Sequence, residues 1–349
     1  MSTTVISGIS DSGEPVRMTE GQMPADVGFI TDFWREQYLE PYITLGGSKI
    51  KFVVGSPGSG KSGCLRRFAS DAAALGCKTA SLSAKSVWLN DFKEIYAAVF
   101  GAVDFQGCLM NCARKIVSEM GRDYDEIPDG ISFADYLAYL GMLDPVTRLE
   151  LRAQINSMFF KNPRMDKNFA VCAAMLTGGI LGHPTLEQSS RELLWSWLKA
   201  EKGVRAPTIR KLGLAPYKIS KHNARHMLRS LIEVVRLAGY TALVVGVDDL
   251  EILTETSSLE EIRYTKMRRE DAYESIRELI DSIDTLDYVM FVFAFGRELL
   301  DDEVCGFKSY QALWMRIQNE ITGGKFNRFS DIIDMDRLRA PGSQETSHE

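Results

Sequence analysis

The sequence has 349 residues, of which 45% are hydrophobic and 25% are charged, and its formal net charge is −6 at pH 7. This length allows one large domain or two, and the hydrophobic content is ordinary for a folded chain. No apolar run approaches the roughly 18 residues that a membrane span needs, and residues 1–16 are too polar for a signal peptide. We therefore expect a cytoplasmic protein with no membrane association.

The cysteines and histidines do not predict a metal site. The six cysteines include no C-x-x-C pair, so neither zinc binding nor a disulfide framework is indicated. Cys108 with Cys112, and His222 with His226, have i, i+4 spacing but no further local ligand. Such a pair is far more often one face of a helix than part of a metal site. We predict reduced thiols and no metal bound by either pair.

The N-terminal segment, residues 1–45, is predicted to be a polar lead and a helix. Aromatic and leucine side chains at helical spacing place the helix over 29–43. Two glycines at 46–47 then turn the chain into a first strand, which ends with Lys51-Phe52-Val53-Val54. This strand leads directly into the most informative stretch of the chain.

Residues 55–62 read Gly-Ser-Pro-Gly-Ser-Gly-Lys-Ser, a complete G-x-x-x-x-G-K-[ST] phosphate-binding loop. Apolar residues at helical spacing predict a helix over 61–75, and Gly76 stands where a left-handed C-cap is expected. The order strand, loop, helix is the context that this motif requires, and it argues against a glycine-rich turn formed by chance.

Each residue type in this loop fits the binding of a triphosphate. Glycines let backbone N–H groups turn inward, and the helix N-terminus adds its dipole. Lys61 supplies a positive charge for the β- and γ-phosphates, and the Ser62 hydroxyl can coordinate magnesium. The residues predicted to bind ATP are Gly55, Ser56, Pro57, Gly58, Ser59, Gly60, Lys61, Ser62 and Gly63.

A second strand is predicted over 78–83 and a helix over 88–103. The next buried strand arrives only near residue 242, so residues 104–221 are interpreted as a helical insertion. The clearest helix of this insertion is predicted to start at Thr185, because Gln188 follows three residues later in a capping-box pattern.

Residues 243–247 form an apolar run that ends in two aspartates, the pattern of a Walker B segment in P-loop ATPases. Asp248 would hold magnesium, and Asp249 would polarise the attacking water. The usual residue at the second position is Glu, and Asp is one methylene shorter. Because a misplacement of about 1 Å can cost roughly 10²-fold in rate, we expect slow hydrolysis. Glu251 is the alternative base, and the sequence does not choose between the two.

The remaining pattern alternates helices and strands. Helices are predicted over 269–284 and 309–321, a fully buried strand over 288–295 and a last strand over 331–335. Right-handed crossovers between parallel strands would place a nucleotide at the C-terminal edge of the sheet.

The predicted fold class is therefore α/β, a P-loop NTPase with a parallel sheet flanked by helices. The nucleotide core comprises 46–103 and 222–338, the helical insertion 104–221 lies between the second strand and the Walker B strand, and 339–349 is a flexible tail.

Two local groups of cations bear on nucleic-acid binding, although the chain as a whole is acidic. Isolated charge runs of this kind are more often solvated faces, so direct DNA binding is possible but not demanded. The two groups are Arg263, Lys266, Arg268 and Arg269, and Arg205, Arg210 and Lys211.

Several segments occur in the order found in one known family: Tyr42-Ile43, 46–52, Trp197-Leu198, 210–213, Gly239-Tyr240, Arg263, 269–273 and 309–313. In these segments, and over about residues 38 to 335, the chain resembles the ATP-binding proteins of bacteriophage-exclusion (BREX) systems, a branch of the AAA-like P-loop ATPases. The resemblance implies an ATPase with ATP and Mg²⁺ as cofactors, working in an antiviral defence complex on or beside DNA. It further implies a homo-oligomer or partner proteins, through which any DNA association would occur.

The sequence departs from the family pattern at Asp249, and few residues follow Met335 to form a helical lid. A nucleotide-controlled switch or loader therefore fits better than a processive translocase. Such ATPases commonly complete their site with an arginine from a neighbouring subunit. Arg316 and Arg297 are the leading candidates and Arg328 a weaker third, with a surface ion pair as the alternative for each leading candidate.

Two other function classes remain open. One is a nucleotide-binding scaffold with negligible turnover. The other is a P-loop kinase, which is disfavoured because the insertion resembles no acceptor-binding lid and the Walker B pair suits activation of water.

Overall fold

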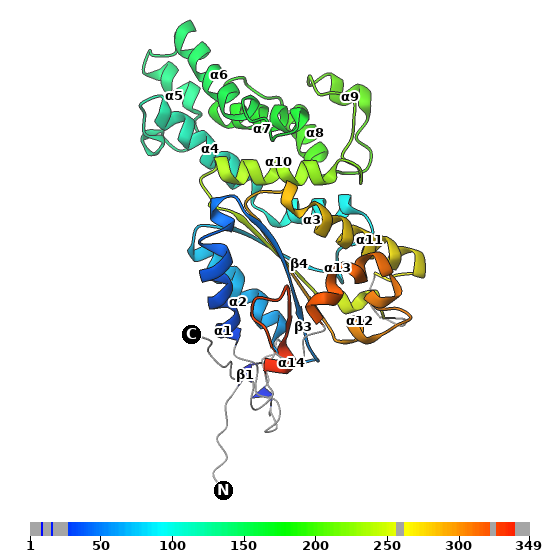
Figure 1. Cartoon of the computed structure of the whole chain (residues 1–349). Helices are drawn as coiled ribbons and strands as arrows, with labels where there is room; N and C mark the ends of the chain where they lie inside the picture. The colour runs from blue at the N-terminus through cyan, green and yellow to red at the C-terminus, as the bar shows by residue number, and fades with distance from the viewer. Residues whose placement is uncertain (1–7, 10–14, 17–26, 256–261, 322–325, 339–349) are drawn as a thin grey trace.

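The computed structural model describes residues 8–9, 15–16, 27–255, 262–321 and 326–338. Its centre is a five-stranded parallel sheet with the strand order β4, β5, β6, β3, β7 (Figure 1). The strands are β3 (Ser48–Val54), β4 (Lys78–Ser83), β5 (Leu243–Asp248), β6 (Val289–Phe295) and β7 (Ile332–Asp334). A separate antiparallel pair joins β1 (Gly8–Ile9) and β2 (Pro15–Val16). The predicted α/β fold with a parallel sheet flanked by helices is confirmed.

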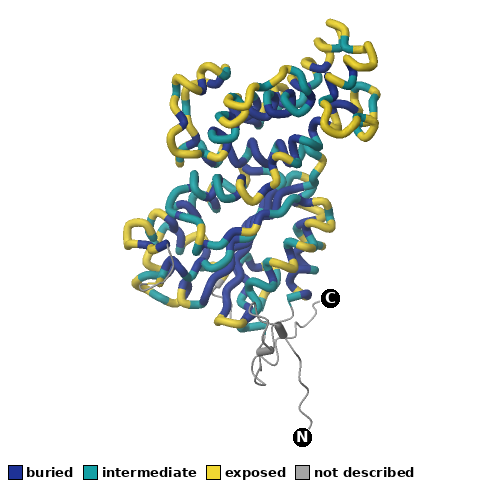
Figure 2. Tube along the Cα trace, turned by 180° about the vertical axis from the view of Figure 1, so that it is seen from behind, coloured by how far each residue is buried: buried dark blue, intermediate teal, exposed yellow. Residues whose placement is uncertain are grey.

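Helices cover both faces of the sheet, and its central strands β5 and β6 are apolar on both sides, as buried parallel strands require. Alternate strand residues such as Val53 and Val292 pack with α1 (Val27–Trp34) and α2 (Lys61–Ala74). Their neighbours, such as Phe52, join the larger core on the opposite face. That face is covered by α3 (Phe92–Ala102), α11 (Lys266–Ser282) and α13 (Gln311–Ile321). Figure 2 shows the buried strands running through the centre of the molecule.

The predicted insertion is helical and lies above the sheet in Figure 1. Its helices are α4 (Phe105–Glu119), α5 (Phe133–Tyr139), α6 (Pro145–Phe160), α7 (Lys167–Leu181), α8 (Gln188–Leu198) and α9 (Ala206–Arg210). One continuous cluster of buried residues runs from the sheet into these helices. The boundaries of core and insertion therefore stay a prediction.

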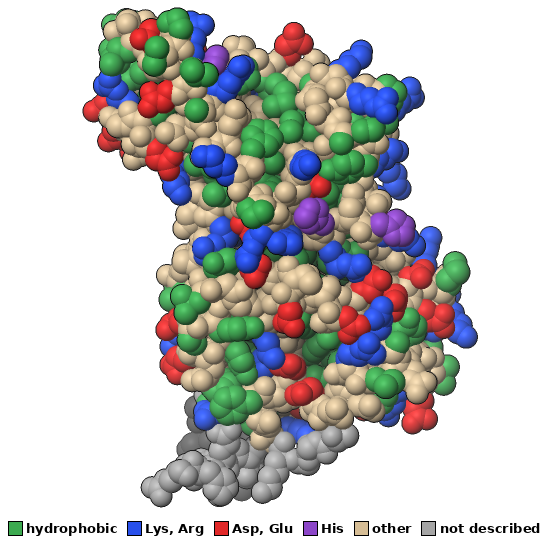
Figure 3. All heavy atoms as spheres, turned by 45° about the horizontal axis from the view of Figure 1, so that its top comes forward, with side chains coloured by type: hydrophobic (Ala, Val, Ile, Leu, Met, Phe, Trp, Pro, Cys, Tyr) green, Lys and Arg blue, Asp and Glu red, His purple; other side chains and the backbone are tan. Residues whose placement is uncertain are grey.

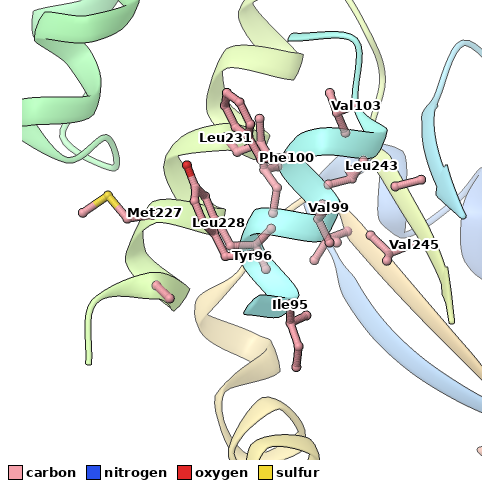
Figure 4. Close-up of a cluster of buried hydrophobic side chains, with 14 of the residues drawn as sticks. Ile95, Tyr96, Val99, Phe100, Val103, Met227, Leu228, Leu231, Leu243 and Val245 are labelled. Carbon is pink, nitrogen blue, oxygen red and sulfur yellow. The ribbon is translucent and has the colours of Figure 1, made fainter. Parts of the chain in front are cut away.

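The junction between sheet and insertion is built by α3, which lies between β5 and α10 (Ala224–Leu237) (Figure 4). Val99 of α3 sits near Leu243 and Val245 of β5, while Tyr96 faces α10. The Tyr96 hydroxyl donates a hydrogen bond to the carbonyl oxygen of Leu198, at 2.7 Å, at the end of α8. This aromatic side chain is fully buried and links the sheet layer to the insertion.

The prediction that a helix starts at Thr185 is wrong. Helix α8 begins at Gln188 with Glu187 as N-cap, and no side chain caps it. Leu186 packs on α7, where a Cβ added to Gly179 would lie 3.3 Å from the Leu186 Cβ. Because this packing holds Leu186 against α7, the helix does not start at Thr185, and the capping box of Thr185 and Gln188 does not form.

The predicted helix over 29–43 is also not a single α-helix. Helix α1 ends at Trp34, the chain continues as a π-helix over Arg35–Leu39, and a 3₁₀ turn follows over Ile43–Leu45. The Glu40 N–H bonds the Arg35 carbonyl at 3.0 Å, the i to i+5 pattern of a π-turn. Other predicted elements differ from the observed ones only at their ends, by one to four residues.

Among the described residues, no single helix is long and apolar enough to cross a bilayer. The consecutive helices α3 and α4 reach that length only together, and they are bent by 60° at their junction. Their apolar faces are buried in the core.

A buried lysine ties β3 to the chain that leads into β7. Lys51 is fully buried, and its ammonium donates to the carbonyl oxygens of Phe329, at 3.0 Å, and Ser330, at 2.9 Å. It also lies 2.9 Å from an Asp331 carboxylate oxygen and donates to the Tyr38 hydroxyl at 3.2 Å. Burial lowers the pKa of Lys51, and the nearby Asp331 carboxylate partly opposes this shift.

We expect Lys51→Ala to lower the free energy of unfolding by about 3 kcal/mol, because it leaves buried carbonyl oxygens without a donor. Lys49→Ala is the matched control, since Lys49 also pairs with Asp331, at 2.8 Å, but is part-exposed. The control should cost less than about 1 kcal/mol. Urea denaturation of both variants checks this, and equal costs would contradict a structural role for the buried ammonium.

Candidate functional site

The predicted phosphate-binding loop follows β3 at the C-terminal edge of the sheet. Its glycines Gly58 and Gly60 have positive φ angles of 74° and 99°, which L side chains rarely adopt. Gly60 is the N-cap of α2, so the first amides of this helix are directed toward the loop. A Cβ added to Gly55 would lie 2.4 Å from the Ser59 hydroxyl oxygen, so a larger residue would not fit.

Lys61 is held by the loop itself. Its ammonium donates to the carbonyl oxygen of Gly55 at 2.8 Å and to that of Ser56 at 3.2 Å. Ser62 follows Lys61 in the first turn of α2. To reach a phosphate, the lysine side chain must exchange these carbonyl oxygens for phosphate oxygens.

Ser62 and Asp248 fit the chemistry of a magnesium site that is completed by a nucleotide. Helix α2 packs on β5, where a Cβ added to Gly246 would lie 3.6 Å from a Leu65 methyl. This contact brings the start of α2 and the end of β5 to the same edge. Mg²⁺ is usually held by one or two protein oxygens together with phosphates and water. The described residues include no group of three or more His, Cys, Asp or Glu that could hold a metal ion.

The two Walker B aspartates are engaged differently. Asp248 accepts a hydrogen bond from the Asp249 backbone N–H at 2.9 Å, and Asp249 has a positive φ of 62°. The Asp249 carboxylate accepts from the Ser83 hydroxyl at 2.6 Å and lies 3.2 Å from the Lys85 ammonium. Asp249 is therefore directed toward the end of β4 and held there by two partners.

Glu251 lies on the other side of the Walker B turn. Its carboxylate accepts from the Gly296 backbone N–H at 3.1 Å, just after β6. Burial raises the pKa of Glu251, and the Lys61 charge and the Gly296 hydrogen bond partly oppose this shift. The Lys61 charge thus acts on Glu251, which the sequence offered as the alternative base.

A carboxylate that sequence reasoning missed contacts the phosphate loop directly. Asp336 lies on the short helix α14 (Met335–Leu338) and accepts from the Ser56 backbone N–H at 2.9 Å and from the Ser56 hydroxyl at 2.9 Å. Arg297 donates to the same carboxylate at 3.1 Å and also pairs with Asp334. Burial opposes ionisation of Asp336, yet the Ser56 and Arg297 hydrogen bonds outweigh it and lower the pKa. Ser56 and Asp336 are 280 residues apart, so no local pattern pointed to this contact.

The structure places the two candidate arginines differently. Arg297 reaches the phosphate loop through Asp336. Arg316 forms a two-pronged ion pair with Asp281, with both N–O distances 3.0 Å, and donates to the carbonyl oxygen of Ala312. The described contacts of Arg316 thus join α13 to α11 and do not involve the loop.

A hollow of about 550 Å³ lies at the opposite end of β3 from the phosphate loop. It is lined by Gln37, Tyr38, Pro41, Tyr42, Ser48, Lys49, Ile50, Ile280, Ile283, Asp284 and Asp331. It shares no residue with the loop, so we do not assign the nucleotide to it.

The two i, i+4 pairs have different surroundings. Cys108 and Cys112 are fully buried on α4, and burial raises the pKa of Cys108 to about 11 and of Cys112 to about 12. The thiols are therefore protonated near neutral pH. His222 lies in the turn before α10 and His226 in the first turn of that helix, and both are exposed.

Comparison with known families agrees with the geometry of the loop. Residues 36–339 match the model of the BREX system ATP-binding protein BrxC/D, which covers the whole sheet and α14. A comparison with curated proteins finds no match. Since the match spans most of the chain and contains the phosphate loop, the protein belongs to the family of BREX system ATP-binding proteins.

Proposed function

We propose that this protein binds Mg²⁺–ATP on residues 55–63 and hydrolyses it slowly, as a nucleotide-controlled switch or loader in a BREX defence complex. Membership of the family supports an ATP-binding role in BREX defence. The observation that carries the proposal is the convergence, at one edge of the sheet, of the phosphate loop, the Walker B aspartates and Glu251. In this assignment Lys61 and the α2 amides bind the phosphates, and Ser62 and Asp248 hold magnesium.

The expectation of slow turnover is supported by the state of the two candidate bases. Asp249 already has two partners, Ser83 and Lys85, which would compete with an attacking water. Glu251 accepts a hydrogen bond from the Gly296 backbone N–H at 3.1 Å, which would likewise compete with an attacking water. Either carboxylate would need a rearrangement on nucleotide binding before it could accept a proton efficiently.

We further propose that the site is completed by an arginine from another subunit or a partner protein. Arg316 is held by Asp281, and Arg297 by Asp334 and Asp336. Assembly would have to release one of them before it could stabilise charge on the γ-phosphate.

A scaffold with negligible turnover is the second candidate function. It is favoured by the same ion pairs, because an arginine that stays paired within its own chain cannot act in trans. Turnover measured without an acceptor, as a function of protein concentration, separates the two functions.

The binding assignment predicts that Lys61→Ala leaves the fold intact and weakens ATP affinity by about tenfold or more. The estimate follows from hydrogen bonds to charged groups, which contribute about 1.5–3 kcal/mol each. Calorimetric titration checks it, with Lys161→Ala as a control that removes an exposed ammonium of the insertion. Unchanged affinity in Lys61→Ala would reject this loop as the nucleotide site.

The assignment of the base predicts opposite effects for two substitutions. Asp249→Glu should speed hydrolysis, because the longer side chain restores the usual reach, and Asp249→Asn should abolish it, while both keep Mg²⁺-dependent binding. If Asp249→Asn retains the parental rate and Glu251→Gln does not, Glu251 is the base. In that case turnover of the parent should fall as the pH decreases through the raised pKa of Glu251, since the protonated form cannot accept a proton.

Assembly dependence predicts that specific activity rises with protein concentration or on addition of a partner. Mixing Lys61→Ala subunits, which keep Arg316, with Arg316→Ala subunits, which keep the ATP site, should restore turnover that neither variant has alone. The same mixture made with Arg297→Ala tests the other arginine. If no mixture shows rescue and activity per subunit is independent of concentration, the site is self-sufficient in one chain.

A further inference from the structure

One segment of this acidic protein is strongly basic. Residues 199–229 contain nine Lys and Arg and a single Glu, a formal charge of +8 in a chain whose net charge is −6. The segment spans the end of α8, the short helix α9 and the start of α10. The chain is acidic as a whole, but residues 199–229 carry a local excess of positive charge.

Most of these cations are exposed and have no acidic partner. Within the described part of the chain, the ion pairs that involve the segment are Lys199 with Glu201, at 4.0 Å, Arg225 with Glu278, and His226 with Asp166, at 3.8 Å. Six exposed cations form no ion pair there: Lys202, Arg205, Arg210, Lys211, Lys218 and Lys221. No carboxylate of the described residues pairs with them, so their charge is available to a ligand.

The backbone that carries these cations is anchored to the rest of the insertion. Ile209 and Leu214 are buried and anchor α9 and the chain after it. Asn168 of α7 is nearly fully buried and clamps Ala215, accepting from its N–H at 2.8 Å and donating to its carbonyl oxygen at 2.9 Å. The Trp197 indole donates to the Tyr217 carbonyl oxygen at 3.0 Å. The backbone that presents the charges is thus fixed before any partner binds.

The basic segment occupies one end of the insertion. Figure 1 shows α9 and its flanking loops at that end, with α5 and α6 at the other. In Figure 3, Lys and Arg side chains gather along this edge of the molecule and continue into the band between the insertion and the sheet. Because α14, which contacts the phosphate loop, lies on the far side of the sheet from the insertion, the basic edge is separate from the nucleotide site.

The side chains of this surface indicate which kind of polyanion it can bind. None of the exposed large hydrophobic side chains of the described structure falls within 199–229, and a membrane-binding basic face would need them. The same absence removes the exposed aromatic platforms on which single-stranded bases stack. What remains is a rigid group of unpaired Lys and Arg, which suits the dense and regular charge of a duplex backbone.

We propose that residues 199–229 bind duplex nucleic acid through its phosphate backbone, without reading its sequence. This goes beyond the ATP site and does not depend on it. In the mode proposed, Arg205, Arg210 and Lys211 contact phosphates directly, since they flank the anchored residue Ile209. This chain itself would then contact nucleic acid, without a partner protein as intermediary.

The test is the affinity of the full chain for a fluorescein-labelled 20-base-pair DNA duplex of random sequence, measured by anisotropy at several salt concentrations. The triple variant Arg205→Ala, Arg210→Ala and Lys211→Ala should lose about tenfold or more in affinity at low salt. The slope of log K against log salt should fall in magnitude by about 3, because each phosphate contact contributes about 0.9.

The matched control removes three exposed cations at the other end of the insertion: Arg148→Ala, Arg152→Ala and Lys161→Ala. It should bind the duplex as the parent does, and so should Lys61→Ala, whose defect concerns ATP. All variants should keep the parental melting temperature. Equal losses in the two triple variants would overturn the proposal, because only net charge would then matter. It is equally overturned if the parent fails to bind the duplex at low salt, or if it binds phosphatidylserine vesicles or oligo-dT in preference to the duplex.

Discussion

The position of β3 between β6 and β7 is the constraint on which the proposed nucleotide site depends. Because all three strands are parallel, the phosphate loop after β3, the Gly296 turn after β6 and the Asp334–Asp336 stretch after β7 must meet at one edge. The fixed register lets Glu251 reach the Gly296 amide and Asp336 reach the Ser56 amide. Lys51 fixes the chain just before β7, because its ammonium donates to the Ser330 carbonyl oxygen. The site is therefore a consequence of strand order.

Charge is distributed unequally over the two ends of the molecule. The phosphate-loop edge carries several carboxylates, namely Asp248, Asp249, Glu251, Asp334 and Asp336, with Lys61 and Arg297 among them. The end of the insertion that bears α9 carries almost only cations. Helix α3 and its buried tyrosine connect the two ends through a continuous core. The two ends are thus joined by packed side chains.

Much of the proposed nucleotide site could be located from the sequence because its signals are local. The phosphate loop, the strand before it and the helix after it occupy consecutive residues, and the apolar runs of β5 and β6 mark buried parallel strands. What could not be predicted depends on distant contacts. Asp336 accepts a hydrogen bond from Ser56, and Lys51 donates to the carbonyl oxygens of Phe329 and Ser330. The capping box at Thr185 does not form because Leu186 packs on α7. The basic segment was visible, but its lack of acidic partners became clear only in the fold.

The contact between Asp336 and Ser56 has a thermodynamic consequence. A phosphate group that takes the Ser56 amide must displace the Asp336 carboxylate, which occupies that donor and shares Arg297 with Asp334. When two ligands exclude one another from one site, each weakens the binding of the other by the same factor. Docked α14 would therefore weaken anion binding as much as a bound anion weakens the docking of α14. Helix α14 would in this sense be an internal ligand of the loop, and the strength of its docking would set the anion concentration at which the loop changes occupant.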